Sequence, residues 1–180
     1  MSTRGVWGLR KDNKDKITYN HYDSYPTELG VIIKEFIIKH RASLNKIFDK
    51  IILVKENSIP DQQQIKDNKQ YFEMVSTRNM NEWYALLRRT QKNPELYTKD
   101  LKYMIDNHKF IKDSLFCEWG YIINLDNNTL EIYRGFQKTP NNNRYKINKS
   151  KEGYYNCALI KEIPFEELKD FSMKTLEKEE

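Results

Sequence analysis

Cysteine, glycine and proline are scarce in this chain, and long hydrophobic runs are missing. Its 180 residues include two cysteines, six glycines and five prolines. Cys117 and Cys157 stand alone without a CxxC spacing, so we expect two free core thiols rather than a disulfide or a metal site. The longest apolar runs, at residues 31–33 and 36–38, fall far short of the roughly 20 residues of a membrane span. No transmembrane helix is therefore predicted, and no membrane partner.

Several other signals are also absent. The N-terminus lacks the basic segment and apolar core of a secretory signal, which predicts a cytoplasmic protein. Glycine-rich phosphate loops are missing, and the histidines at 21, 40 and 108 show no metal-ligand spacing, so we expect neither a cofactor nor a metal. The net charge of +5 permits nucleic-acid contact, but basic residues form no block in the sequence. Nucleic acid is therefore not the favoured partner.

The order of patterns predicts an α+β fold in a single domain over residues 1–180. Strand-like runs stand at both ends of the chain, and a helical insertion over about residues 60–112 separates them. The N- and C-terminal strands are expected to meet in one antiparallel sheet. The length is sufficient to bury a real core but leaves little room for two domains.

Individual elements follow from spacing and turn residues. Residues 5–10 and 17–23 read as two strands around a polar loop at 11–16, and residues 119–125 and 130–136 form a second hairpin. Helices are expected over 29–40, 42–48 and 61–71, around Trp83 with a cap at Asn79 or Asn81, from Pro94 to near Asn107, and over 165–176. Residues 51–54 read as a buried strand and 154–163 as the last strand.

The first candidate site lies at the end of the second strand. On a strand, Tyr19, His21 and Asp23 would share one face, so His21 could act in acid-base chemistry or contact a ligand, with Asp23 or Asn20 orienting it. The alternative is structural: the same polar groups organise the turn into the first helix. So many ionisable groups are costly to bury unless they are satisfied, which keeps the functional interpretation open.

Two further residues belong to this candidate site. Arg4 on the neighbouring strand is expected to bind an anion, and Tyr25 either contacts the ligand or packs the turn at Pro26. Ser2 raises a separate hypothesis. If Met1 is removed, the amine of Ser2 could activate its own hydroxyl, and this loosely resembles the start of N-terminal-nucleophile hydrolases, with Arg4, Asn20 and Asp23 as partners.

The strand that begins at Phe116 carries the other candidates. Cys117 would need a basic neighbour to act as a nucleophile, so a core role is favoured. Across the hairpin, Arg134 is expected to approach Glu118 or Trp119, either as an ion pair or as an anion contact. We therefore include Glu118 and Arg134 among the candidate ligand-binding residues.

Three segments carry a resemblance to a protein family. The start Met-x-Thr-Arg-Gly, the run Tyr-Asn-His-x-Asp-Ser-Tyr-Pro-x-x-Leu-Gly at 19–30, and Ser-Leu-Phe-Cys-Glu-Trp at 114–119 resemble a group of uncharacterised small bacteriophage and prophage proteins. The resemblance implies an accessory protein that binds and modulates or inhibits a host factor, such as a defence protein or its nucleotide signal. A host protein or a nucleotide-like ligand is thus the expected partner. The alternative is a small hydrolase that uses Ser2 or the His21 and Asp23 pair.

Overall fold

The main sheet of the protein has five strands. In this computed structural model, which describes residues 3–72 and 81–177, the strand order is β2-β1-β5-β6-β7. The bounds are β1 Gly5–Lys11, β2 Lys14–Asn20, β5 Trp119–Asn124, β6 Thr129–Arg134 and β7 Ala158–Pro164. The expected α+β fold is confirmed. The sheet is not wholly antiparallel, however, because β1 pairs with β5 in parallel, from Gly5 opposite Trp119 to Arg10 opposite Asn124.

Short helical elements lie along the rest of the described chain, joined by turns and extended segments. The α-helices are α1 Val31–His40, α2 Leu44–Lys50, α3 Gln62–Asp67, α4 Lys69–Phe72 and α5 Trp83–Leu87. A π-helical turn covers Pro26–Gly30, and 3-10 turns cover Arg41–Ser43, Arg88–Thr90, Pro94–Thr98, Phe110–Lys112, Phe165–Glu167 and Met173–Glu177. None of the helices within 3–72 and 81–177 is long and apolar enough to cross a membrane.

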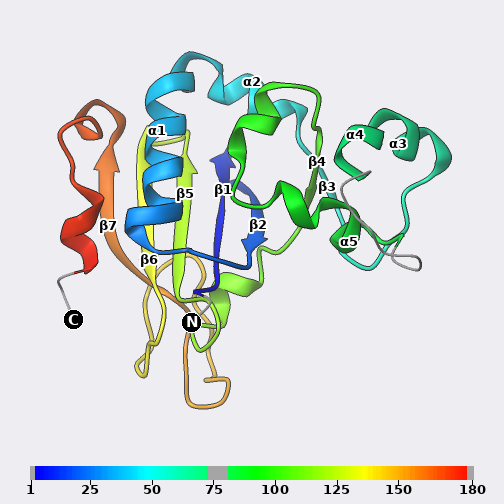
Figure 1. The fold of residues 1–180 in the computed structure, drawn as a ribbon. Coiled ribbons are helices and arrows are strands. Elements are labelled where there is room, and N and C mark those ends of the chain that lie inside the picture. Colours follow the sequence, from blue (N-terminus) through cyan, green and yellow to red (C-terminus); the bar gives the residue numbers. More distant parts are fainter. Residues whose placement is uncertain (1–2, 73–80, 178–180) are drawn as a thin grey trace.

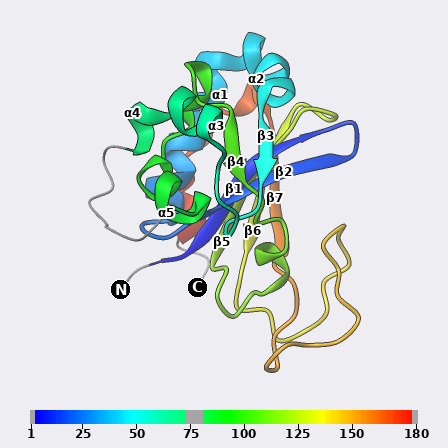
Figure 2. The same cartoon turned by 90° about the vertical axis from the view of Figure 1, so that its right-hand side faces the viewer.

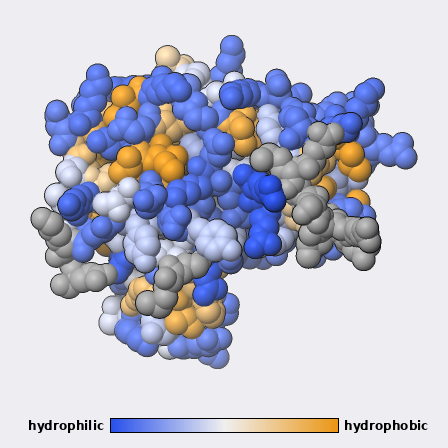
Figure 3. All heavy atoms as spheres, in the orientation of Figure 1, coloured by the Kyte–Doolittle hydropathy of each residue, from blue (hydrophilic) through white to orange (hydrophobic). Residues whose placement is uncertain are grey.

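Each face of the sheet has its own hydrophobic core, because side chains alternate along every strand. Trp7, Tyr121 and Ile132 point into the larger core, on the face of the sheet that α1 crosses (Figure 1). Their strand neighbours Val6, Ile122 and Tyr133 join a smaller core with Ile111, Cys117, Tyr145 and Cys157. Both cysteines are buried and free, as expected. On the side seen in Figure 3, apolar atoms gather over α1 within a largely hydrophilic surface.

The segment predicted as a helical insertion contains one strand of a second, two-stranded sheet. β3 (Ile52–Val54) and β4 (Tyr103–Ile105) pair in parallel, and Figure 2 shows them side by side, running toward the end of the molecule where the loop over residues 135–157 projects. The prediction of a helix from Pro94 to Asn107 is wrong, because only a 3-10 turn at Pro94–Thr98 forms before the chain becomes extended in β4. β3 is also less buried than predicted, since Ile52 is 48% exposed.

Element ends account for most of the other differences. The first hairpin turns tightly at Asp12 and Asn13, which both adopt positive φ, so the polar loop is shorter than expected. Glu82, rather than Asn81, occupies the position before α5, and Asn79 lies outside the described residues. The last strand begins at Ala158 instead of 154. Two 3-10 turns replace the terminal helix over 165–176.

Candidate functional site

A cleft opens where the two parallel strands of the small sheet end. Residues 55–57 follow β3 and residues 106–108 follow β4, and both segments line a cleft of about 830 Å³. The carboxyl ends of parallel strands lie at the same edge of a sheet, which is where open α/β sheets usually bind ligands. Residues 109, 110, 112 and 113 and the tip of the loop over 135–157 complete the lining. We call this the lysine cleft.

Five lysines from three separate segments line the lysine cleft: Lys55, Lys109, Lys112, Lys149 and Lys151. Lys151 forms an ion pair with Asp113, and this contact raises the pKa of the Lys151 ammonium group. The other four have no ion-pair partner within 3–72 and 81–177. Unpaired ammonium groups around one concave surface attract anions, and phosphate above all.

The floor of the lysine cleft is fixed by Asn107. Its side-chain amide donates to Glu56 Oε2 at 3.1 Å, and its side-chain oxygen accepts from the backbone N–H of Tyr19 at 3.0 Å. The backbone N–H of Asn107 donates to Ile17 O at 2.8 Å, which ties the cleft to the edge strand β2. Glu56 thus accepts from an amide and forms no ion pair with the lysines among the described residues.

Phe110 and Ile147 supply apolar lining. The ring of Phe110 is held by an edge-on contact with Tyr19, with ring centroids 5.0 Å apart. Proteins that bind single-stranded nucleic acids combine an aromatic ring with a basic groove, because the bases stack on the ring while the phosphates pair with the cations.

A histidine–carboxylate pair also lies in the lysine cleft. Nδ1 of His108 is 2.6 Å from Oδ1 of Asp106, and the backbone N–H of His108 donates to the same oxygen at 3.2 Å. Because an ionised carboxylate can only accept hydrogen bonds, Nδ1 carries the proton and the ring orientation is fixed. Nε2 of His108 has no hydrogen-bond partner in the described part of the chain. This nitrogen can therefore accept a proton.

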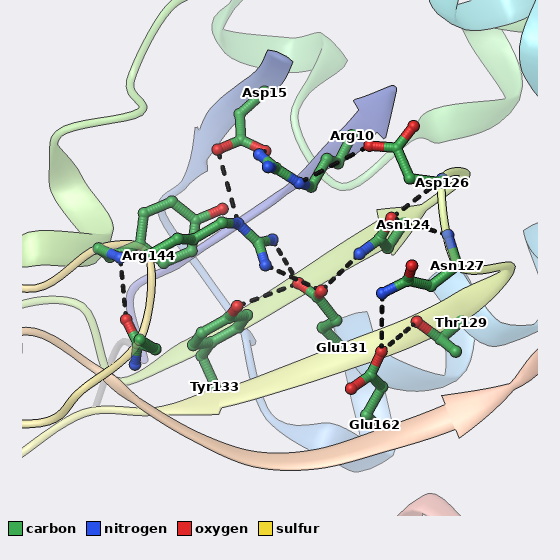
Figure 4. A network of polar contacts seen from close by, with 12 residues as sticks. Arg10, Asp15, Asn124, Asp126, Asn127, Thr129, Glu131, Tyr133, Arg144 and Glu162 are labelled. Carbon is green, nitrogen blue, oxygen red and sulfur yellow. Dashed lines mark hydrogen bonds and ion pairs between the residues drawn. The ribbon is translucent and has the colours of Figure 1, made fainter. Parts of the chain in front are cut away.

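A polar network on the sheet holds the loop over residues 135–157 in place (Figure 4). Glu131 on β6 is 2% exposed, and its carboxylate accepts from Asn124 at 2.7 Å and from the hydroxyl of Tyr133 at 3.0 Å. Arg144 on the loop donates to both oxygens of the carboxylate, one of them at 2.8 Å. The guanidinium also lies 3.8 Å from Asp15 on β2. This network fixes the loop that brings Lys149 and Lys151 to the cleft.

The sheet topology brings together four of the residues predicted from the sequence. Arg4 precedes β1, Asn20 ends β2, Glu118 precedes β5 and Arg134 ends β6, and the strand register places all four at one end of the sheet. The backbone N–H of Arg4 donates to Glu118 Oε1 at 3.3 Å. The guanidinium of Arg134 lies 4.3 Å from the centroid of the Trp119 ring, so a cation–π contact crosses the hairpin at this point.

His21 and Asp23 do not orient each other as the strand pattern predicted. β2 ends at Asn20, and Asp23 adopts a φ of 51°, so the two residues share no strand face. The hydroxyl of Tyr19 lies 2.6 Å from Nδ1 of His21, whereas Asp23 pairs with Lys92 at 3.2 Å. Both line a hollow of about 250 Å³ together with Asn20, Tyr22, Arg88, Gln91 and Lys92.

The electrostatics of this hollow favour neutral histidine. Burial lowers the pKa of His21 below its usual 6.5, and the nearby charges of Arg88 and Arg4 lower it further. Lys92 is engaged by both Asp23 and Glu28, and although burial opposes them, these two carboxylates raise its pKa. Asn20 is buried and donates to Ser24 Oγ at 2.8 Å and to the backbone oxygen of Tyr22, which is the structural role weighed as the alternative.

The remaining predicted residues take separate positions. Tyr25 is 39% exposed at the start of the π-helical turn, and Tyr22 is 53% exposed. Ser2 lies outside the described residues. Cys117 is buried, and burial raises its pKa well above the usual value, so this thiol is unsuited to nucleophilic attack. Within 3–72 and 81–177, no group of three or more histidine, cysteine or acidic side chains is placed to hold a metal ion.

Sequence reasoning missed the lysine cleft. Its residues come from three distant segments, so no basic block appears in the sequence. One available signal was the spacing Asp106-x-His108, which has the same separation, in reverse order, as the His21-x-Asp23 spacing that drew attention to the first hairpin. Comparison of the chain with protein-family models, with curated proteins and with solved structures finds no match.

Proposed function

We propose that this protein binds a nucleotide-like ligand, a short chain of nucleotides, through its phosphates in the lysine cleft. The observation that carries the proposal is the convergence of Lys55, Lys109, Lys112 and Lys149 on one cleft without acidic partners among the described residues. The volume of about 830 Å³ lies within the range of small-ligand sites. Phe110 offers a ring on which a base can stack.

The resemblance to phage proteins supplies the biological setting of the proposal. A cytoplasmic accessory protein with this cleft would bind a nucleotide ligand of the host, such as a defence signal. The net charge of +5 supports attraction of such an anion at a distance. The hydrolase hypothesis built on His21 and Asp23 receives no support from the geometry, because these side chains engage Tyr19 and Lys92.

A binding titration tests the proposal. Fluorescence anisotropy of a short, labelled, single-stranded oligodeoxynucleotide is expected to rise with protein concentration, and Lys109→Glu/Lys149→Glu is expected to weaken binding at least about tenfold through lost charge contacts. Lys46→Glu/Lys174→Glu makes the same charge change outside the cleft lining and serves as the matched control. Equal weakening by both pairs would show that the cleft is not the site.

A further inference from the structure

His108 and Asp106 give the lysine cleft more than a binding surface. The pair follows β4 directly, and the backbone N–H of Asp106 donates to Val54 O at 2.9 Å, which anchors the pair to the small sheet. The His108 side chain is 44% exposed and that of Asp106 31% exposed, so solvent and ligands reach both. A histidine that is oriented through Nδ1 and accessible at Nε2 has the arrangement of a general base.

We propose that the lysine cleft cleaves phosphodiester bonds between ribonucleotides, a proposal that rests on the binding function proposed above. His108 acts as the catalytic base, and Asp106 is its positioning residue. Ribonucleotides suit these residues because they carry their own nucleophile, the 2′-hydroxyl, next to the phosphorus atom. One base and a set of cations are then sufficient. Both are present in the cleft lining.

The reaction is an internal transesterification. Nε2 of His108 removes the proton of the 2′-hydroxyl, and the 2′-oxygen forms a bond to phosphorus. The bond between phosphorus and the 5′-oxygen breaks, and its electron pair leaves with that oxygen, which takes a proton from water. The imidazolium returns its proton to the hydroxide so formed. The products are a 2′,3′-cyclic phosphate and a 5′-hydroxyl, with no net consumption of water.

The remaining groups have distinct tasks in this reaction. The additional negative charge that develops on the phosphoryl oxygens is stabilised by the unpaired ammonium groups of the cleft, among them Lys109 and Lys112. The carboxylate of Asp106 holds the Nδ1–H tautomer of His108 and stabilises the imidazolium that forms during the reaction. Phe110 and Asn107 complete the surface against which the nucleotide lies.

The test uses a short RNA and its all-deoxy counterpart with the purified full chain. We expect the RNA to be cleaved to products with 2′,3′-cyclic phosphate ends, identified by mass spectrometry, whereas the deoxy strand is bound and stays intact. His108→Ala is expected to lower the cleavage rate at least about 100-fold without changing binding of the deoxy strand. Asp106→Asn should lower the rate while the melting temperature stays unchanged and binding of the deoxy strand is not weakened, since the amide can hold the ring but not the positive charge.

His40→Ala is the matched control. His40 pairs with Glu95 at 2.9 Å and is not among the residues that line the cleft, so its loss should leave cleavage unchanged. If the deoxy strand binds but the RNA stays intact, or if His108→Ala prepared in the same way cleaves as fast, the catalytic proposal is wrong while the binding site stands. If neither strand binds and neither is cleaved, the binding proposal fails with it.

Discussion

Arg144 meets Glu131 through two hydrogen bonds, one to each oxygen of a carboxylate that is almost wholly buried. The two residues come from different parts of the fold, since Glu131 is on β6 and Arg144 is in the loop over residues 135–157. The neighbouring residue Tyr145 is 3% exposed, and its ring packs into the smaller core, which fixes the same loop against the sheet. The ion pair therefore connects the sheet to the segment that supplies two lysines of the cleft.

Replacement of Arg144 by methionine should destabilise the protein by about 3–5 kcal/mol, because it leaves the carboxylate of Glu131 buried without its cation. The free energy of unfolding in urea measures this. Arg41→Met is the matched control, since the Arg41–Glu166 pair is 53% and 66% exposed and should contribute less than about 1 kcal/mol. The double variant Glu131→Gln/Arg144→Met should recover part of the lost free energy of unfolding. An equal loss in Arg41→Met and Arg144→Met would contradict the stabilising role of the buried Glu131–Arg144 pair.

The same Arg144→Met variant should also weaken oligonucleotide binding, although Arg144 does not line the lysine cleft. The physical reason is the freer loop, which no longer holds Lys149 and Lys151 in place. Anisotropy titration at a temperature where the variant is fully folded measures the effect. Unchanged affinity in a folded variant would show that the loop is positioned by other contacts.

Salt should weaken binding in proportion to the number of cleft lysines that contact phosphate. For single strands the logarithm of the affinity falls with the logarithm of salt concentration by about 0.7 for each phosphate contact. Lys109→Gln or Lys149→Gln should therefore reduce the slope by about 0.7, while Lys46→Gln leaves it unchanged. Anisotropy titrations over a series of salt concentrations measure the slopes. Identical slopes for all three variants would exclude direct phosphate contacts of Lys109 and Lys149.

The protonation of His21 should respond to Arg88. Burial and the charges of Arg88 and Arg4 lower its pKa, so folding loses stability as the pH falls below about 6.5, where the unfolded chain takes up the proton first. Arg88→Gln should raise the pKa of His21, as measured by an NMR titration of the ring protons. Arg89→Gln removes the neighbouring charge, which is not among the causes of the lowered pKa of His21, and should shift the titration less than Arg88→Gln does.

Alkaline pH should unfold the protein through its buried tyrosines. Burial raises the pKa values of Tyr97, Tyr121, Tyr133 and Tyr145 above the ordinary 10. The unfolded chain loses these protons first, so stability is complete below pH 10 and declines as the pH rises beyond it. Tyrosinate absorbance should rise in two phases, the second coinciding with loss of the circular dichroism signal. A single phase that precedes unfolding would contradict this.

The fold could be predicted where local patterns decide it. The hairpin of β5 and β6 and the amphipathic helix α1 depend on alternation and helical spacing, and both were found. Tyr103 to Ile105 could not be assigned in this way, because a short apolar run suits either a helix or a strand. Its parallel pairing with Ile52 to Val54, about fifty residues earlier, makes it a strand.

The candidate site was predictable only in part, for a related reason. The sequence placed Arg4 with Asn20 and Glu118 with Arg134 in two separate hairpins, and the parallel pairing of β1 with β5, which local patterns do not reveal, brings the two pairs to one end of the sheet. The lysine cleft depends on long-range packing of three segments. Whether each lysine has an acidic partner can be read only from the three-dimensional structure. His21 and Asp23 failed as a pair because the strand ends one residue before His21.

The parallel pairing of β1 with β5 has a consequence for synthesis of the chain. β1 lies between β2 and β5, so a strand that leaves the ribosome long before its partner β5 becomes an inner strand of the finished sheet. The edge of β1 that faces β5 stays unpaired until the segment that begins at Trp119, the partner of Gly5, has been synthesised. Contacts between residues so far apart in the sequence slow folding. Until then the hairpin of β1 and β2 presents an open strand edge to the cell, and a nascent chain that stalls before residue 119 is exposed to mispairing and to chaperones.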